Sequence, residues 1–237
     1  FTSKMNAIDP ETLGMVKKAV ALISESKGQW KGLVVHNEAE NFSVGANLGL
    51  ALFAINIAMW PAIEDLIKTG QEAYQALRFA PFPTVAAPSG MALGGGCEIT
   101  LHCSAVQAHA ETYIGLVEVG VGIIPGWGGC AQMLGRAFNA KKRFGGPIPP
   151  ISQVFETVSM AKVAKSAAEA MDMHYLRPTD GITMNRDRLL YDAKQRVLDL
   201  AKDYRPPLPW VLNLPGATGR AALNLAIEGF RMMGKAL

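Results

Sequence analysis

The chain has 237 residues, of which 49% are hydrophobic and 18% are charged, and its formal net charge is +3. This composition is that of a globular protein rather than a disordered one, and the length suits one large domain or a domain with a small appendage. Because the sequence has no block of Lys and Arg and no apolar segment long enough to cross a bilayer, nucleic acids and membranes are not expected as partners.

The cysteines indicate the compartment. Cys97, Cys103 and Cys130 lack metal-ligand spacing, and an odd number without a Cys-x-x-Cys pair favours a reducing compartment with buried thiols. We therefore expect a cytoplasmic protein without a metal site.

The four histidines are scattered, without a nucleophile or an orienting acid at motif spacing, so each is a weak catalytic candidate. The sequence starts at Phe1 without a visible signal peptide, and we expect it to be part of a longer protein.

The first half of the chain predicts alternating helices and strands. Asp9 and Pro10 suit the cap and the first position of a helix. A continuous apolar run over 32–36 has the length of a strand buried on both faces. Helices are then expected over 48–63, where the apolar segment suits the cover of a pocket, and over 64–79. A short strand is expected over 84–87.

The second half predicts more helices. A helix is expected to start at Glu98, followed by a strand over 105–108 and a helix over 128–137. The run GGPIPP over 145–150 cannot form a regular helix or a central strand, so it marks a loop or boundary. Further helices are expected over 187–202 and 217–237, with a proline-rich linker over 205–209.

The stretch 82–136 concentrates the features of a reactive site. Gly94, Gly95 and Gly96 allow the backbone to approach a ligand closely, and the N–H groups that begin the next helix can hold an oxyanion. Glu98 lies at the entrance of that helix, and Glu118 follows in a run almost free of charge. Two carboxyl groups in apolar surroundings beside exposed amides predict acid–base chemistry.

Three motifs in this order resemble the enoyl-CoA hydratase/isomerase (crotonase) family. They are NFSVGANL over 41–48, ALGGGCE over 92–98, and VE at 117–118 followed by PGWGG over 125–129. Together they are far more specific than any one motif alone, and the two glutamates have the spacing of the family's hydratases.

The resemblance implies an α/β fold, a crotonase-like spiral of ββα units with a C-terminal helical region. The crotonase core would occupy 1–158 and the helical region 159–237. The family's first β-hairpin is absent, so the sequence is expected to start late in the fold. The match is strong over 30–136 and weakens from Phe144. The resemblance resumes over 166–176, where it implies a helix. His174 stands where the family has the glycine that ends this helix, a position that favours positive φ.

The implied function is the hydration of trans-2-enoyl-CoA to 3-hydroxyacyl-CoA in fatty-acid β-oxidation. The coenzyme A thioester would be the substrate, and no cofactor is implied. Glu98 would orient and deprotonate the water, Glu118 would donate a proton, and the backbone amides of Ala46 and Gly95 would form the oxyanion hole. The helix start favours an ionised Glu98, and the apolar run favours a protonated Glu118. The resemblance also implies substrate or coenzyme A contacts from the surrounding loops, at Lys4, Met5, Ala7, Asn47, Leu48, Gly94 and Val117.

Two alternative functions stay open. One is another crotonase-fold reaction on an acyl-CoA, either double-bond isomerisation or thioester hydrolysis, although the isomerases usually keep one glutamate. The other is a non-catalytic acyl-CoA-binding domain that serves a fused dehydrogenase, against which the presence of both glutamates argues. The GMALGGGCE segment fits neither the dinucleotide nor the P-loop pattern.

The family also implies partners. Its members form trimers, so a homotrimer or dimer of trimers is expected. The run DRLLYDAK over 187–194 and the Arg-Pro-Pro at 205–207 resemble the hydratase region fused behind a 3-hydroxyacyl-CoA dehydrogenase in bifunctional β-oxidation proteins. A fusion to an N-terminal dehydrogenase is therefore a further expectation.

Overall fold

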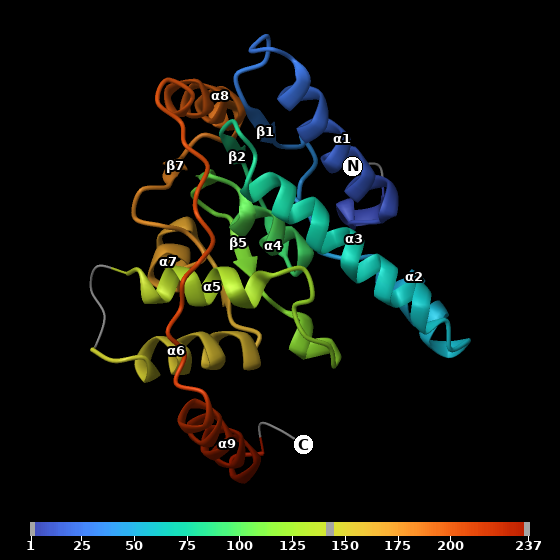
Figure 1. The fold of residues 1–237 in the computed structure, drawn as a ribbon, viewed down its shortest axis with the longest axis vertical. Coiled ribbons are helices and arrows are strands. Elements are labelled where there is room, and N and C mark those ends of the chain that lie inside the picture. Colours follow the sequence, from blue (N-terminus) through green and yellow to red (C-terminus); the bar gives the residue numbers. More distant parts are fainter. Residues whose placement is uncertain (1–2, 141–144, 235–237) are drawn as a thin grey trace.

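Two small sheets form the centre of the molecule in the computed structural model, which describes residues 3–140 and 145–234 (Figure 1). The first sheet is parallel throughout and has the order β1-β2-β4-β7. Its strands are β1 (Leu33–Val35), β2 (Thr84–Ala86), β4 (Ala105–His109) and β7 (Gly181–Thr183). In the second sheet β5 pairs in parallel with β3 and antiparallel with β6. These strands are β3 (Met91–Leu93), β5 (Tyr113–Gly115) and β6 (Val163–Ala164).

Two loops extend the second sheet beyond β3. The Ser43 N–H donates to Met91 O, and the Leu93 N–H donates to Ser43 O, each at 2.9 Å. On the other side of this segment, the Ile8 N–H donates to Gly45 O at 2.7 Å. Segments far apart in the sequence, around residues 8, 45 and 94, therefore lie side by side.

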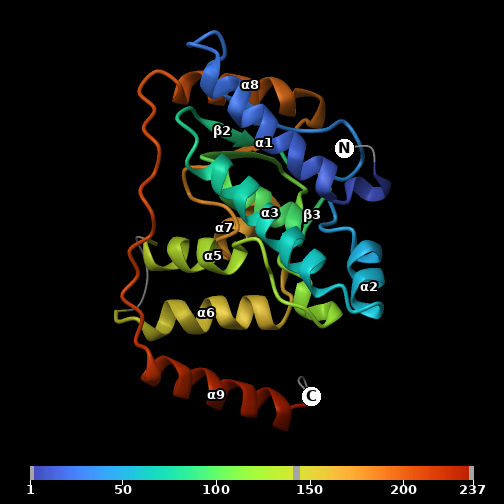
Figure 2. The same ribbon diagram turned by 45° about the vertical axis from the view of Figure 1, so that its right-hand side comes forward.

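Helices enclose the sheets (Figure 2). The predicted start of α1 (Pro10–Glu25) is confirmed, because Asp9 Oδ1 accepts the Thr12 N–H at 2.8 Å. Helix α1 packs on α3 (Trp60–Arg78), and α4 (Gly95–His102) lies at the buried centre. The short 3₁₀ helix η3 (Arg186–Arg188) leads into α8 (Leu189–Leu200), which covers the parallel sheet with Leu189, Ala193 and Val197.

The helices predicted over 48–63 and 64–79 divide at a different place. Helix α2 (Leu48–Asn56) ends earlier than expected, and α3 already begins at Trp60. Ala58 lies between them with φ 55, a conformation that interrupts a right-handed helix. The following Pro61 fits the first turn of α3, because that turn needs no intrahelical acceptor for its N–H groups.

The C-terminal half contains α5 (Gly129–Phe138), α6 (Ile148–Ser159), α7 (Ala167–Asp172) and α9 (Ala217–Met232). The prediction that 145–150 excludes a regular helix is wrong at its end, because α6 begins at Ile148. Pro149 and Pro150 fall in its first turn, where a missing N–H costs nothing. His174, expected at a positive-φ position, has φ 65. The end of the last predicted helix, over 235–237, and Phe144 lie outside the described residues.

An extended segment over 201–216, here called the strap, follows α8. It runs past the ends of α5 and α6 and leads to α9 (Figures 1 and 2). Helix α9 returns onto α6 through Phe230, whose ring stacks on Phe155 with centroids 6.1 Å apart. The strap therefore connects the parallel sheet's covering helix to the far side of the molecule.

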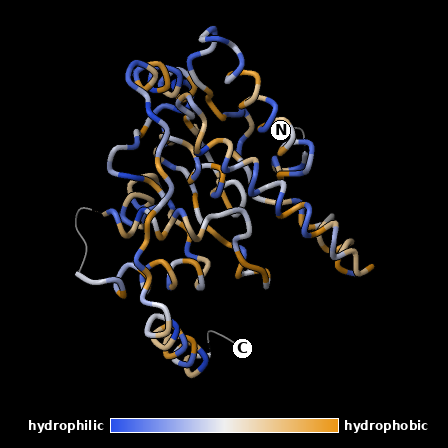
Figure 3. Tube along the Cα trace, viewed as in Figure 1, coloured by the Kyte–Doolittle hydropathy of each residue, from blue (hydrophilic) through white to orange (hydrophobic). Residues whose placement is uncertain are grey.

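Hydrophobic residues occur along α2 and on α9 (Figure 3), and many of them are exposed. From the start of α2 to the start of α3 the exposed ones are Leu48, Leu52, Phe53, Ile55, Ile57, Met59 and Trp60. In the ranges 3–140 and 145–234 we find no helix long and apolar enough to cross a membrane.

Candidate active site

Two glycine-bearing loops meet at the edge of the second sheet. Gly45 has φ +96, and a Cβ at this position would lie 3.1 Å from the Gly95 nitrogen. Only glycine combines this backbone conformation with so close an approach. The close approach brings Ala46, the residue after Gly45, next to the start of α4. The two predicted oxyanion-hole residues, Ala46 and Gly95, are thus neighbours in space.

The start of α4 differs from the expected one. The helix begins at Gly95 and not at Glu98, because Gly94 turns the chain with φ 53. The Gly95 N–H is therefore one of the free donors of the helix's first turn. Across the described residues, neither this N–H nor that of Ala46 has a hydrogen-bond acceptor. The Gly95 carbonyl is fixed from behind by the Tyr74 hydroxyl, which donates to it at 2.9 Å.

Glu98 is held in place by backbone amides. Its side chain is 1% exposed, and Oε1 accepts the N–H groups of Trp127 and Gly129 at 2.9 and 2.8 Å. Both donors belong to the PGWGG motif over 125–129. The motif was recognised in the sequence, but its contact with Glu98 was not predicted. The second oxygen, Oε2, is left for another partner.

Glu118 begins the 3₁₀ helix η2 (Glu118–Val121) and is half-buried. Its Oε1 lies 3.4 Å from the position of a Cβ built on Gly94. Its Oε2 is buried and has no hydrogen-bond partner among the described residues. The carboxyl group therefore lies against the glycine turn that leads into α4, with one oxygen available to a bound molecule.

Both carboxyl groups have a raised pKa. Burial, followed by the negative charge of Glu118, raises the pKa of Glu98 to about 8, against the two N–H bonds that lower it. Burial also raises the pKa of Glu118. The raised pKa of Glu98 runs against the expectation that this carboxyl group is ionised. Glu98 lies deeper than the helix start suggested, and desolvation outweighs its amide donors.

Three aromatic side chains support this centre, and the sequence did not indicate their roles. His102 Nδ1–H donates to the Glu98 carbonyl at 2.7 Å, and burial lowers the pKa of His102 to about 4, so the ring is neutral. Trp127 packs edge-on to Tyr74 with ring centroids 5.5 Å apart. A Cβ on Gly95 would lie 2.6 Å from Trp127, so this ring packs directly on Gly95.

The predicted substrate contacts surround the same place. Lys4 and Met5 lie in the 3₁₀ helix η1 (Lys4–Asn6), and Met5 O accepts the Val44 N–H at 3.3 Å. Asn47 caps α2 by accepting the Gly49 N–H at 3.2 Å. Of the other predicted contacts, Ala7 follows η1, Leu48 follows Asn47, Gly94 precedes Gly95, and Val117 precedes Glu118. Contact of these seven residues with coenzyme A stays a prediction.

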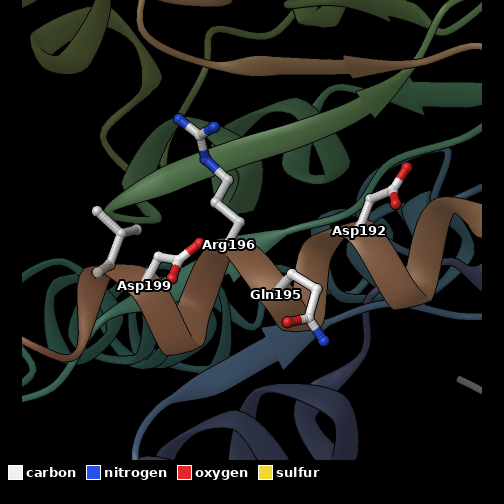
Figure 4. Close-up of a pocket in the computed structure, with 5 residues that line it drawn as sticks. Asp192, Gln195, Arg196 and Asp199 are labelled. Carbon is white, nitrogen blue, oxygen red and sulfur yellow. The ribbon is translucent and has the colours of Figure 1, made fainter.

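A hollow elsewhere on the surface has different chemistry. It measures about 470 Å³ and is lined by Asp192, Gln195, Arg196, Asp199 and Leu200, which project from α8 (Figure 4). It contains neither glutamate nor glycine turn, so it is separate from the candidate active site. Over 3–140 and 145–234, no group of three or more His, Cys, Asp or Glu could hold a metal ion.

Comparison with known proteins gives consistent results. Residues 2–142, more than half of the chain, match the family model described as enoyl-CoA hydratase/isomerase. The chain is 41% identical over 235 residues to a protein of Bacillus subtilis named probable 3-hydroxyacyl-CoA dehydrogenase, covering 99% of this chain and 29% of that protein. It is 33% identical over 228 residues to the putative fatty acid oxidation complex trifunctional enzyme of Rickettsia felis, covering 96% of this chain and 29% of that protein.

Solved structures match in fold. An enoyl-CoA hydratase from Polaromonas sp. JS666 has a TM-score of 0.69 at 21% identity, over 83% of this chain and 69% of that chain. A putative enoyl-CoA hydratase from Streptomyces coelicolor A3(2) has a TM-score of 0.69 at 19% identity, over 98% and 80% of the two chains. These likenesses confirm the predicted crotonase-like α/β fold.

Proposed function

The chain belongs to the enoyl-CoA hydratase/isomerase family, and we propose that it hydrates trans-2-enoyl-CoA to 3-hydroxyacyl-CoA in fatty-acid β-oxidation. The observation that carries this proposal is the meeting of one buried and one half-buried carboxyl group with two free amides. Glu98 and Glu118 provide the carboxyl groups, and Ala46 and Gly95 provide the N–H donors. The names of the curated relatives support a role in acyl-CoA oxidation.

The amides would stabilise the charge that the reaction creates. Attack of water on C3 of a conjugated thioester pushes negative charge onto the thioester oxygen. Two preorganised N–H groups, of Ala46 and Gly95, would hold this oxygen while the charge develops, and one such donor contributes about 3–4 kcal/mol to the transition state. The hydroxyl of Tyr74 would keep the Gly95 peptide in position, because it bonds to the carbonyl of the same residue.

The carboxyl groups would move the protons. One must accept a proton from the attacking water, and the other must deliver a proton to C2. Burial raises the pKa of both groups, and the charge of Glu118 adds to this effect at Glu98, so the pair is suited to hold one proton at neutral pH. We assign water activation to Glu98 and proton delivery to Glu118, so the proton must pass from the deeper Glu98 to Glu118 when substrate and water bind.

Loss of the absorbance of the conjugated thioester tests this proposal. Crotonyl-CoA and a longer trans-2-enoyl-CoA are offered to the wild type, Glu98→Gln and Glu118→Gln. We expect hydration by the wild type and a loss of roughly 10²–10⁴-fold in kcat for each variant, because each removes one proton-transfer group.

The matched control is Glu111→Gln, an exposed glutamate in the turn before β5, which should keep wild-type activity. If the wild type binds both thioesters but leaves the absorbance unchanged, hydration is wrong. Isomerisation, thioester hydrolysis or acyl-CoA binding without turnover would then be the functions to examine.

The chain spans less than a third of the curated relatives that it matches, which points to a larger assembly. We propose that it is the hydratase part of a cytoplasmic multifunctional protein with an N-terminal dehydrogenase, and that it forms a homotrimer or dimer of trimers. The exposed apolar residues of α2 support self-association, since apolar patches of this kind mark interfaces. Light scattering after gel filtration tests the assembly, and a monomer at all concentrations would contradict it.

A further inference from the structure

A second cavity lies where the strap crosses the ends of α3, α4 and α5. Its volume is about 180 Å³. The strap contributes Tyr204, Arg205, Pro207 and Trp210, and the core contributes Arg78, His102, Cys103, Ser104, Arg136 and Arg177. The glutamates and the glycine turn of the proposed active site are not among these residues.

The lining carries an excess of positive charge. Four arginines and no acid line the cavity. Across the described residues the one carboxylate in an ion pair with any of them is Asp180, which binds Arg177 at 3.2 Å. Arg78 and Arg136 are each 7% exposed, so bulk water screens their charges poorly.

The buried arginines are held in place by neutral groups. Arg78 Nη1 donates to Gln132 Oε1 at 2.7 Å, and its guanidinium lies 4.5 Å from the centroid of the Trp210 ring. Arg136 donates to the carbonyls of Tyr175 and Leu101 at 2.6 and 2.9 Å. A guanidinium has five N–H donors, so these contacts fix the two side chains without using all of their donors.

Repulsion between the arginines contributes to the lowered pKa values of Arg78 and Arg136. Burial, followed by the charge of Arg177, lowers the pKa of Arg78 to about 10 and that of Arg136 to about 9. A bound anion would remove this penalty, because it would place an opposite charge among the guanidinium groups. Several arginines around one small cavity match the geometry of a tetrahedral oxyanion better than that of a neutral ligand.

We propose that this cavity binds a phosphate-type oxyanion, which links the strap to the core. The anion would contact Arg78 and Arg136 from the core and Arg205 from the strap. Because residues from both sides are needed, binding would stabilise the strap on α5. The site goes beyond the proposed hydratase activity and does not depend on it.

Calorimetric titration of the full chain with inorganic phosphate, in a chloride buffer of constant ionic strength, tests the proposal. The variant Arg205→Gln removes one cation at an exposed position, and Arg220→Gln removes one from the exposed face of α9 as the control for overall charge. We expect saturable binding to the wild type and to Arg220→Gln, and a dissociation constant roughly tenfold or more higher for Arg205→Gln.

A second titration identifies the source of the phosphate group. Adenosine 3′,5′-bisphosphate is offered to the same three proteins. If Arg205→Gln raises the Kd for inorganic phosphate, the natural ligand is a free phosphate ion. If Arg205→Gln raises the Kd only for the bisphosphate, the natural ligand is the phosphate group of a nucleotide. If neither ligand binds, or if Arg205→Gln and Arg220→Gln bind both as tightly as the wild type, the proposal is wrong.

Discussion

Glu98 is the residue in which opposing effects are balanced most closely. Two backbone N–H groups favour its carboxylate, whereas burial and the neighbouring Glu118 favour its protonated form. Burial has the larger effect, and the pKa rises from 4.5 to about 8. A carboxyl group with this pKa can change its protonation state near neutral pH, which suits a residue that exchanges protons in each turnover.

The raised pKa predicts that stability depends on pH. The folded protein binds the Glu98 proton more tightly than the unfolded chain, so stability should fall as pH rises from about 5 to about 8. Glu98→Gln should reduce this loss, because its amide can still accept both N–H bonds but does not ionise. Thermal unfolding across this range measures the effect, at about 2–4 °C for each kcal/mol. Glu111→Gln, on the surface, should keep the wild-type slope, and an equal slope in Glu98→Gln would refute the assignment.

The same pair predicts the pH dependence of hydration. The reaction needs one proton on the pair, and this proton is lost above about pH 8. We therefore expect kcat/KM to fall as pH rises above about 8, and to fall again in acid when both groups are protonated. Initial rates across pH measure this profile. A rate that stays constant well above pH 8 would exclude the shared proton.

The proximity of the four predicted site residues could be predicted because they stand in three motifs, but their electrostatics could not. The motifs place Glu98, Glu118, Ala46 and Gly95 together, and the structure brings them together. The burial of Glu98 depends on Trp127 and the turn before α5, which fold over it from 29 residues away along the chain. Depth of burial is a tertiary property, so the raised pKa of Glu98 could not be read from neighbouring residues.

At the scale of elements, the close contact between the Gly45 loop and the start of α4 sets the spacing of the two amides. Gly45→Ala would add a Cβ 3.1 Å from the Gly95 nitrogen at φ +96. We expect kcat to fall by roughly 10²–10³-fold, the effect of losing one oxyanion donor. The control is Gly14→Ala in α1, where a Cβ meets nothing within 4 Å and should leave kcat unchanged while stabilising the helix slightly. Wild-type kcat in Gly45→Ala would contradict this role of the loop.

Elements with strong local signals were predicted, and very short ones were missed. The cap at Asp9 and the apolar runs around β1, β2 and β4 identified their elements within a few residues. Strands β3, β5, β6 and β7 were missed, because three residues or fewer are too few for an alternating pattern. Strands β1 and β2 are equally short and were identified from the apolar runs around them. Helix α6 was missed because its prolines suggested a loop, although a helix tolerates them in its first turn.

At the scale of the whole molecule, the strap is anchored to the core by Trp210. Its ring lies over Arg78, its Nε1–H donates to Gln132 Oε1 at 3.1 Å, and it packs directly on Gly135. Trp210→Ala should cost about 2 kcal/mol and make the strap accessible to proteases. Trp30 is 59% exposed, so Trp30→Ala should have little effect on stability or on cleavage of the strap. Limited proteolysis with mass mapping measures both, and an uncut strap in Trp210→Ala would contradict the anchoring role.

The overall fold was predicted through the motifs rather than through the pattern of hydrophobic residues. Periodicity indicated alternating helices and strands, but it gave neither the order β1-β2-β4-β7 nor the separate second sheet. The path of the strap could not be predicted, because an Arg-Pro-Pro segment indicates an extended chain without indicating which surface it follows. Its position depends on single contacts such as that of Trp210.

Hydration in water enriched in ¹⁸O tests the central claim most directly. Mass spectrometry of the products from a trans-2-enoyl-CoA would show where the oxygen goes. We expect the wild type to form an intact 3-hydroxyacyl-CoA that carries one ¹⁸O. In Glu98→Gln and Glu118→Gln, the amount of this labelled product should fall in parallel with turnover. Label in a free carboxylic acid with release of coenzyme A, or an unlabelled thioester with a shifted double bond, would contradict the assignment as a hydratase.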